Sequence, residues 1–221
     1  MQPDISVVIV TWNGRHHLQT CLSSVAAQIA VRAETIVVDN GSTDGTAEFV
    51  RSQFPWVKLV ALGENRGFAG GNNAGVREAR GHLVAFLNND TAADAGWLRA
   101  LAAAVDEGDR FALVTSRIVY MHDPDTIDSA GDGVLRWGGA FKRHHGEPAS
   151  AALVTQEVFG VCGAACMMPK AVFEELAAST MISLRRTKTS TSRTGPGFAD
   201  IAAAMLPTPS CVMSEARRLE P

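Results

Sequence analysis

The stretch ISVVIVTWN, residues 5–13, restricts the fold more than any other part of the sequence. It opens with a mainly β-branched apolar run, which is typical of a strand buried on both faces. Three residues with polar groups, Thr11, Trp12 and Asn13, follow at once. Ligands of a parallel sheet bind beyond the carboxyl ends of its strands. We therefore expect these three residues at a binding edge.

The same alternation of strand and helix continues outward from this stretch. Further strands are predicted at residues 35–38, 57–62, 83–87 and 111–119, and helices at 18–25, 43–54, up to about 80, and 97–105. This order predicts an α/β fold with a Rossmann-like, doubly wound, mostly parallel sheet. Residues 120–157 interrupt the alternation and predict a long excursion with a hairpin that covers a substrate. Residues 157–168 predict one or two more strands, and a helix begins at Lys170.

Composition excludes several classes of protein. The chain has 221 residues and a net charge of −3, which argues against nucleic-acid binding by broad electrostatics. Its apolar runs are shorter than a membrane span, and MQPDISVVIV lacks the basic start of a signal peptide. The spacing of the four cysteines, Cys21, Cys162, Cys166 and Cys211, favours buried reduced thiols over a zinc site or disulfides. We expect a cytoplasmic protein.

Carboxylates stand at the ends of two predicted strands. Asp39 can accept hydrogen bonds from a base or a ribose, or it can cap the helix that begins near Thr43. Asn88, Asn89 and Asp90 follow the strand at 83–87. The single carboxylate suits Mg²⁺ or Mn²⁺ shared with a diphosphate substrate. The alternative is a cap for the helix at Trp97.

Residues 64–73, ENRGFAGGNN, predict a loop whose glycines let the backbone approach a ligand. Asn65 and Arg66 supply donors there. The glycine spacing does not match a dinucleotide fingerprint, which weakens a third hypothesis, a nicotinamide oxidoreductase.

Four segments, in this order, resemble glycosyltransferase family 2: ISVVIVTWNGRHHLQTCLSSVAAQ, ETIVVDNGSTDGTAEFV, ENRGFAGGNNAGVREARG and LVAFLNNDT. More narrowly they resemble its bacterial rhamnosyltransferase-like branch. EVFGVCGAACMMPKAVFEEL resembles the later part of that domain, where the acceptor site forms. The resemblance covers about residues 4–178 and implies a GT-A fold, a nucleotide-sugar donor and Mg²⁺ or Mn²⁺.

The resemblance also implies roles for single residues. Asp39 would read the pyrimidine base, and Asp90 would be the metal ligand. The remaining donor-binding positions are Thr11, Trp12, Asn13, Asn65, Gly70, Gly71, Asn72, Asn88 and Asn89. Asn88 stands where a strict DxD motif has its first aspartate.

The implied reaction is an inverting sugar transfer from a UDP- or dTDP-sugar, including dTDP-rhamnose. The metal would act as a Lewis acid on the leaving diphosphate, and a carboxylate base would deprotonate the acceptor hydroxyl. The implied acceptor is a saccharide or lipid-linked sugar of a surface polysaccharide, met at the inner membrane face. No nucleic acid is expected as a partner.

The catalytic base of the family is missing from this sequence. The resemblance requires a Gly-Gly-Phe-Asp segment and then a Glu-Asp pair, and neither occurs after Leu176. We assign no catalytic residue. The chain is expected to be inactive, and the alternative function is nucleotide-sugar binding without turnover.

The sequence changes character after residue 178. Residues 1–178 carry a net charge of −6 and residues 179–221 a net charge of +3, with 12 Ser and Thr in the latter. A single base deleted near codon 177 converts a family-like Glu-Leu-Gly-Gly-Phe-Asp-Asp-Asp-Phe coding into residues 175–183. The same offset across residues 187–192 permits Glu-Asp-Val-Asp-Leu. We therefore predict a domain at 1–178 and a frameshifted, poorly packed tail at 179–221.

Three remaining features have plain alternatives. His122, His144 and His145, with Asp123, Asp125 and Asp128, fit no metal motif, and a solvated loop is favoured. Trp137 either stacks on an acceptor sugar or anchors its own loop. Lys142 and Arg143 together are candidates for contact with anionic lipid headgroups.

Overall fold

The structure is a computed structural model that describes residues 2–107, 113–153, 156–179 and 215–218. Its centre is a six-stranded sheet in the order β3-β2-β1-β4-β11-β6. The strands are β1 (Ile5–Thr11), β2 (Ala33–Asp39), β3 (Lys58–Ala61), β4 (Leu83–Leu87), β6 (Val114–Thr115) and β11 (Ala165–Pro169). β1 pairs in parallel with β2 and β4, and β2 with β3. β11 is antiparallel to both β4 and β6, so the predicted mostly parallel sheet is confirmed with an antiparallel side.

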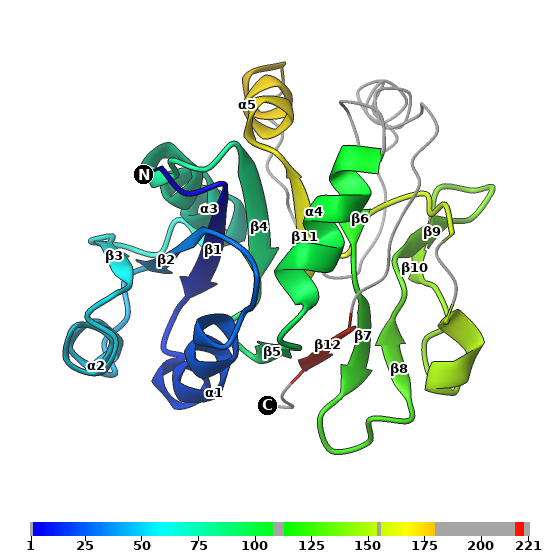
Figure 1. The fold of residues 1–221 in the computed structure, drawn as a ribbon, viewed down its shortest axis with the longest axis horizontal. Coiled ribbons are helices and arrows are strands. Elements are labelled where there is room, and N and C mark those ends of the chain that lie inside the picture. Colours follow the sequence, from blue (N-terminus) through cyan, green and yellow to red (C-terminus); the bar gives the residue numbers. More distant parts are fainter. Residues whose placement is uncertain (1, 108–112, 154–155, 180–214, 219–221) are drawn as a thin grey trace.

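Helices cover both faces of this sheet (Figure 1). One apolar cluster joins β1 to α1 (Arg15–Ala26), α2 (Thr46–Gln53) and α4 (Trp97–Glu107). A second cluster joins the opposite face to α3 (Gly67–Glu78) and α5 (Lys170–Ser179). The alternation read from the sequence therefore produces a doubly wound arrangement, because each helix buries its apolar stripe on the sheet.

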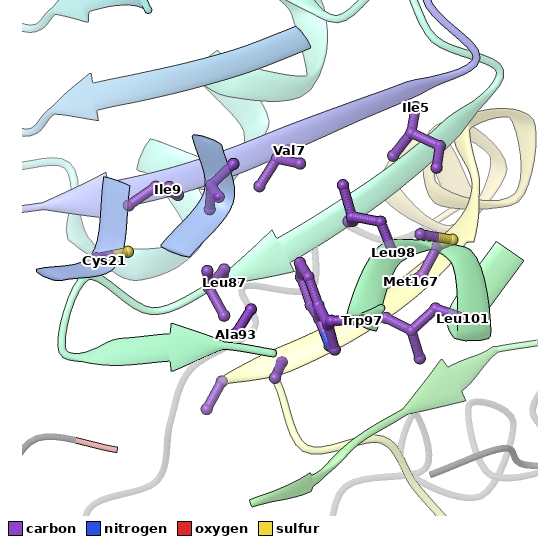
Figure 2. Packing of buried hydrophobic residues seen from close by; sticks show 14 of the residues in the cluster. Ile5, Val7, Ile9, Cys21, Leu87, Ala93, Trp97, Leu98, Leu101 and Met167 are labelled. Carbon is purple, nitrogen blue, oxygen red and sulfur yellow. The ribbon is translucent and has the colours of Figure 1, made fainter. Parts of the chain in front are cut away.

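Trp97 lies at the middle of the larger cluster, among Leu87, Leu98, Leu101 and Met167 (Figure 2). Its side chain is 1% exposed. The indole Nε1–H donates to Ser116 Oγ at 2.8 Å, so the one polar group of the ring is satisfied inside the core. This contact holds α4 against the segment that follows β6.

A smaller four-stranded sheet lies beside the central one, in the order β5-β12-β7-β8. Its strands are β5 (Thr91–Ala93), β7 (Arg117–Tyr120), β8 (Ile127–Ser129) and β12 (Glu215–Arg218). The predicted strand at 111–119 is corrected to two strands, β6 and β7. The chain passes from one sheet to the other at Ser116, whose N–H donates to Ala165 O at 3.0 Å.

The excursion predicted at 120–157 contains the expected hairpin. β9 (Asp132–Val134) and β10 (Ala140–Lys142) pair antiparallel, and a short 3₁₀ helix η1 (Ala149–Ala152) follows. Val119, Ile127, Ala130 and Ala152 form a small apolar cluster of their own. The excursion therefore packs around a small apolar core that is separate from the clusters on the central sheet.

The loop predicted at residues 64–73 is wrong in its second half, because α3 begins at Gly67. A Cβ on Gly71 would lie 2.6 Å from Val10 Cγ1, and one on Gly75 would lie 2.4 Å from Val8 Cγ1. These glycines bring the helix backbone close to β1. The glycines were correctly predicted to allow a close approach of the backbone, but at Gly71 the neighbour approached is the sheet and not a ligand.

Of the predicted tail at 179–221, the structure describes Ser179 and residues 215–218. Residues 215–218 form β12, which pairs with β5 and β7. The rest of the tail lies outside the described residues, so the division at residue 178 and the poor packing stay predictions. Over the described ranges, no helix has the length and apolarity needed to cross a bilayer.

Candidate functional site

The carboxyl ends of three strands meet at one edge of the central sheet. Thr11, the last residue of β1, is paired in register with Asp39 at the end of β2. On its other side β1 pairs with β4, which leads into Asn88, Asn89 and Asp90. Asn89 Nδ2 donates to the buried Thr11 Oγ1 at 2.9 Å. The structure thus brings together polar residues that lie up to about 80 positions apart in the chain, as the sequence predicted.

Asp39 is 4% exposed and accepts a hydrogen bond from Ser42 N at 3.0 Å. This bond closes a turn directly after the strand. The alternative role as a helix cap is wrong, because α2 begins at Thr46 and Asp44 Oδ1 accepts from Thr46 N at 3.1 Å. Asp39 is therefore a buried carboxylate at the sheet edge that serves no helix.

Asn13 fastens the loop after β1 to the loop after β2. Its backbone is left-handed, with φ 51°, which a non-glycine residue seldom adopts. Its N–H donates to Ser42 Oγ at 2.9 Å, and its side-chain oxygen accepts from Thr43 N at 2.8 Å. The neighbouring Trp12 is 57% exposed. Asn13 holds the loops together, and Trp12 presents its ring to a ligand or to solvent.

Asn40 is the site residue that the sequence reasoning missed. It is 2% exposed, and its N–H donates to Thr11 O at 2.9 Å. Nδ2 donates to Asn65 Oδ1 and to Gly67 O, each at 3.1 Å, while Oδ1 accepts from Arg66 N at 2.9 Å. One carboxamide therefore joins the ends of β1 and β2 to the start of α3. The sequence did contain a signal for this role. An asparagine stands directly after Asp39, at a position where the turn itself requires no particular side chain.

The predicted donor residues of the third loop divide into two groups. Asn65 is exposed, and its Oδ1 also accepts from Gly67 N at 2.8 Å. Gly70, Gly71 and Asn72 lie within α3, with Gly71 and Asn72 buried. Asn72 Nδ2 donates to Phe68 O at 3.0 Å. Asn65 faces the loops. Gly70, Gly71 and Asn72 were wrongly predicted to lie in a loop, because glycine and asparagine are weak helix formers.

Asp90 lies between β4 and β5, and its Oδ1 accepts from Thr91 Oγ1 at 3.3 Å. The preceding Asn88 donates its N–H to Ala164 O at 2.8 Å, which ties this segment to the chain entering β11. The alternative role of residues 88–90 as a cap for α4 is wrong, because β5 separates them from Trp97.

His17, on the first turn of α1, lies within electrostatic reach of Asp90. Burial and the nearby His16 lower the pKa of His17, while Asp90 opposes that shift. The side chain is therefore held toward the neutral form. A neutral imidazole leaves the negative charge of Asp90 available for a cation.

No three His, Cys, Asp or Glu side chains in the described ranges gather closely enough to hold a metal ion alone. Mg²⁺ usually keeps several waters and binds through one or two carboxylates plus substrate phosphates. One carboxylate at the strand ends, flanked by amide side chains, fits that pattern. Asp90 is the residue that would hold such an ion.

The histidines and aspartates of residues 122–145 make local contacts and do not form a single cluster in the described residues. Lys142 Nζ lies 2.5 Å from Asp128 Oδ1, His145 Nδ1 lies 2.8 Å from Asp128 O, and His144 bonds Glu147. Asp128 is 2% exposed, so the favoured solvated loop is corrected at this residue, which is buried against its lysine. In the same region burial raises the pKa of Asp132, and the nearby Lys142 opposes that shift.

Of the cysteines that the structure describes, Cys21 and Cys166 are buried, as expected, and Cys162 is partly buried. Cys21, Cys162 and Cys166 form no disulfide among the described residues. Burial raises the pKa of Cys21 and of Cys162, which disfavours the thiolate that metal binding or nucleophilic attack requires. Cys211 lies outside the described residues.

Several known proteins with similar sequences are named as glycosyltransferases or as polysaccharide biosynthesis proteins. The succinoglycan biosynthesis protein ExoO of Rhizobium meliloti is 35% identical over 105 residues, 47% of this chain and 30% of that protein. The glycosyltransferase AglE of Haloferax volcanii is 33% identical over 101 residues, 43% of this chain and 33% of that protein. The matched segments thus span about a third of these relatives.

Two solved structures share the fold. S. aureus TarS 1-349 in complex with UDP-GlcNAc has a TM-score of 0.58 at 19% identity, over 79% of this chain and 47% of that chain. The mannosyltransferase PcManGT of Pyrobaculum calidifontis, in complex with GDP-Man and Mn²⁺, has a TM-score of 0.55 at 20% identity, over 80% of this chain and 47% of that one. The expected GT-A fold is thereby confirmed.

The family model described as "Glycosyl transferase family 2" matches residues 6–177, which include all three strand ends of the site and all of the central sheet except Ile5. The alternation of strands and helices, the polar edge formed by β1, β2 and β4, and the likeness to ExoO and AglE all agree with this match. This chain belongs to glycosyltransferase family 2.

Proposed function

We propose that the edge formed by β1, β2 and β4 binds a nucleotide-diphosphate sugar, and that the domain derives from an enzyme that transfers this sugar to a saccharide or lipid-linked acceptor. The observation that carries the proposal is the bonded set of loops around Asp39 and Asn40. Loops that are already held in one arrangement before the ligand binds lose less conformational entropy on binding, so the ligand binds more tightly. The names of the solved neighbours include UDP-GlcNAc and GDP-Man, which supports a nucleotide-sugar donor.

Within this proposal each residue has a defined task. Asp39 accepts hydrogen bonds from the base, Trp12 and Asn65 border the nucleoside, and Thr11 and Asn89 shape the floor between them. Asp90 holds Mg²⁺ or Mn²⁺ together with the diphosphate, with Asn88 beside it. The bound metal supplies positive charge that stabilises the leaving nucleotide. Asn13 positions its loop, and Gly71 lets the start of α3 lie close to β1.

The proposed donor is a UDP- or dTDP-sugar, including dTDP-rhamnose, and the proposed outcome is inversion at the anomeric carbon. Relatives named for succinoglycan and teichuronic acid biosynthesis support a role in bacterial surface polysaccharides. The acceptor would then be met at the inner face of the membrane, by a protein that is otherwise cytoplasmic.

A second candidate function is donor binding without turnover. The observation that favours it is the absence from the printed sequence of both the Gly-Gly-Phe-Asp segment and the Glu-Asp pair. We propose that a frameshift near codon 177 caused this loss, since one offset recovers both segments for one possible choice of codons. Sequencing the gene tests this. If no single-base change near that codon restores both segments, the tail is a genuine Ser- and Thr-rich sequence.

The binding proposal is tested by calorimetry with UDP, dTDP, GDP and NADH, each with and without Mn²⁺. We expect metal-dependent binding of a pyrimidine diphosphate and none of NADH. Binding at a hundredfold excess over Kd also raises the free energy of unfolding by ~2.7 kcal/mol, visible as a thermal shift. Donor hydrolysis or transfer then distinguishes an enzyme from a binding domain. A protein that binds no nucleotide diphosphate refutes both candidates.

A further inference from the structure

The hairpin of β9 and β10 exposes an unusual amount of apolar surface. Val134 is 40% exposed, Leu135 37%, Trp137 81% and Phe141 45%. These residues lie close together in the chain, whereas isolated exposed apolar residues are ordinary. Clustered exposed apolar side chains mark a contact with another molecule or a membrane.

Both faces of this hairpin carry apolar side chains. In the antiparallel register Val134 lies opposite Ala140, and Phe141 lies opposite Gly133. Neighbouring pairs point to opposite faces of a two-stranded ribbon. The Phe141 ring covers Gly133, where an added Cβ would lie 2.4 Å from Phe141 Cζ. A ribbon with apolar side chains on both faces can bury both of them in a medium that surrounds it, such as the interface of a bilayer.

The tip of the hairpin is a tight turn that presents Trp137. Leu135 N donates to Gly139 O, and Gly138 N donates to Leu135 O, each at 2.8 Å. Gly138 has φ +87°, a conformation that glycine adopts without strain. These bonds fix the turn, and the indole is 81% exposed although it lies beside Gly139 of the same turn. The two roles considered for Trp137, stacking on an acceptor sugar and anchoring its loop, both stay predictions.

The charge of this segment complements an anionic surface. The hairpin, residues 132–142, contains Arg136, Lys142 and one acid, Asp132, which gives it a net charge of +1 in a chain whose net charge is −3. Lys142 is paired with Asp128, and Arg143 bonds Gln156 Oε1 and Glu157 O. Among the described residues, neither Arg136 nor Arg143 is ion-paired with a carboxylate.

We propose that the β9–β10 hairpin, residues 132–142, inserts its tip into the headgroup region of an anionic lipid bilayer. Trp137 and Leu135 enter the interface, where tryptophan is favoured, while Arg136 contacts a lipid phosphate. Figure 1 shows the hairpin at the opposite edge of the molecule from β2 and β3, clear of the three strand ends. Insertion there leaves the nucleotide edge open. The inference rests on the proposed function in one respect: a lipid-linked acceptor explains why the protein binds a membrane.

Vesicle sedimentation of the full chain tests the inference. We expect binding to phosphatidylglycerol–phosphatidylcholine vesicles and at least tenfold weaker binding to pure phosphatidylcholine. Trp137→Ser with Leu135→Ser reduces the partition coefficient at least tenfold. Arg136→Ser reduces it about fivefold on anionic vesicles, the equivalent of one basic residue worth ~1 kcal/mol. The matched control is Trp56→Ser, which removes a 48% exposed tryptophan beside β3 and leaves binding unchanged.

Three results would overturn the inference: no binding to anionic vesicles, equal loss in the Trp56→Ser control, or a concentration-dependent dimer that the Trp137→Ser and Leu135→Ser changes abolish. A blue shift of tryptophan emission on adding vesicles, absent in Trp137→Phe, supports insertion of this residue directly. Nucleotide calorimetry on the same samples separates the two proposals. Nucleotide binding without vesicle binding refutes the hairpin inference alone, and the reverse result refutes the proposed function alone.

Discussion

The two ends of β1 show how differently one strand can use buried polar groups. At the carboxyl end, Asn40 and Asn13 join three loops around the proposed nucleotide edge. At the amino end, the fully buried Ser6 Oγ donates to Glu34 Oε1 at 2.7 Å and accepts from Gly81 N at 2.9 Å. Both ends satisfy their buried groups, as a stable core requires. In the described part of the chain the carboxyl end also carries an exposed aromatic ring, Trp12, whereas the carboxylate at the amino end, Glu34, is ion-paired with Arg80. This difference separates a candidate site from a structural joint.

The largest expected effect is on the packing of α3 against the strand between these two ends. Gly75→Val places a branched side chain where even a Cβ would lie 2.4 Å from Val8 Cγ1. Such overpacking costs at least ~1–3 kcal/mol of unfolding free energy, and a helix cannot move away without breaking its contacts. Urea denaturation measures the loss. Gly63→Val is the control, because an added Cβ there meets nothing within 4 Å. Equal stability of both variants would contradict the close packing.

Asn40→Ala compares the two ends directly. It leaves the N–H of Arg66 and the carbonyl of Gly67 without their carboxamide partner, at a cost of roughly 1–3 kcal/mol in a buried setting. We expect a lower melting temperature together with weaker UDP binding. Amide hydrogen exchange at Arg66 should accelerate even without nucleotide.

Ser6→Ala is the matched control for Asn40→Ala. It removes buried hydrogen bonds of similar number from the amino end and lowers the melting temperature, but we expect unchanged UDP affinity and unchanged exchange at Arg66. If both variants weaken nucleotide binding equally at matched stability, Asn40 has no specific role in positioning the loops.

Asp39→Ala is expected to weaken nucleotide binding by roughly 1–3 kcal/mol, the scale of a charged hydrogen bond lost in a site. Calorimetry with UDP and dTDP measures it. Asp44→Ala, which removes the carboxylate that bonds the start of α2, should mainly lower stability. Unchanged affinity in Asp39→Ala would leave that carboxylate a turn residue.

Asp90→Asn is expected to remove the metal dependence of donor binding while leaving metal-free affinity nearly unchanged. Hard cations favour a charged carboxylate over a neutral amide of the same shape. The measurement is the ratio of UDP affinities with and without Mn²⁺, compared between the two proteins. The same ratio in both would place the metal ligand elsewhere.

The smallest expected effect is on the stability of the β9–β10 hairpin. Trp137→Ser removes a side chain that is 81% exposed, so the free energy of unfolding should change by no more than ~0.5 kcal/mol. Thermal denaturation checks this. A large loss would mean that the indole packs within the fold, and it would weaken the case for a membrane contact.

The sequence by itself determined the order of strands and helices around the central sheet. Residues 83–87 are a continuous apolar run and residues 5–10 are apolar except for Ser6, and the stripes at Leu18 to Val25 and Trp97 to Val105 have helical spacing. Such periodicity records which faces are buried, so it survives without coordinates. Asp39 and Asp90 could be placed at one edge on the same grounds, because parallel strands end together.

Only the tertiary structure decided what the glycines and amides do. A glycine is needed wherever backbones approach closely, and the sequence does not say whether Gly71 approaches a ligand or, as found, Val10. The carboxamide of Asn40 bonds groups that lie 25 to 27 residues away, which no local pattern encodes. The exposure of Trp137 likewise depends on whether another segment folds over it. Local propensity and periodicity are properties of neighbouring residues, whereas these three roles are properties of distant segments brought into contact.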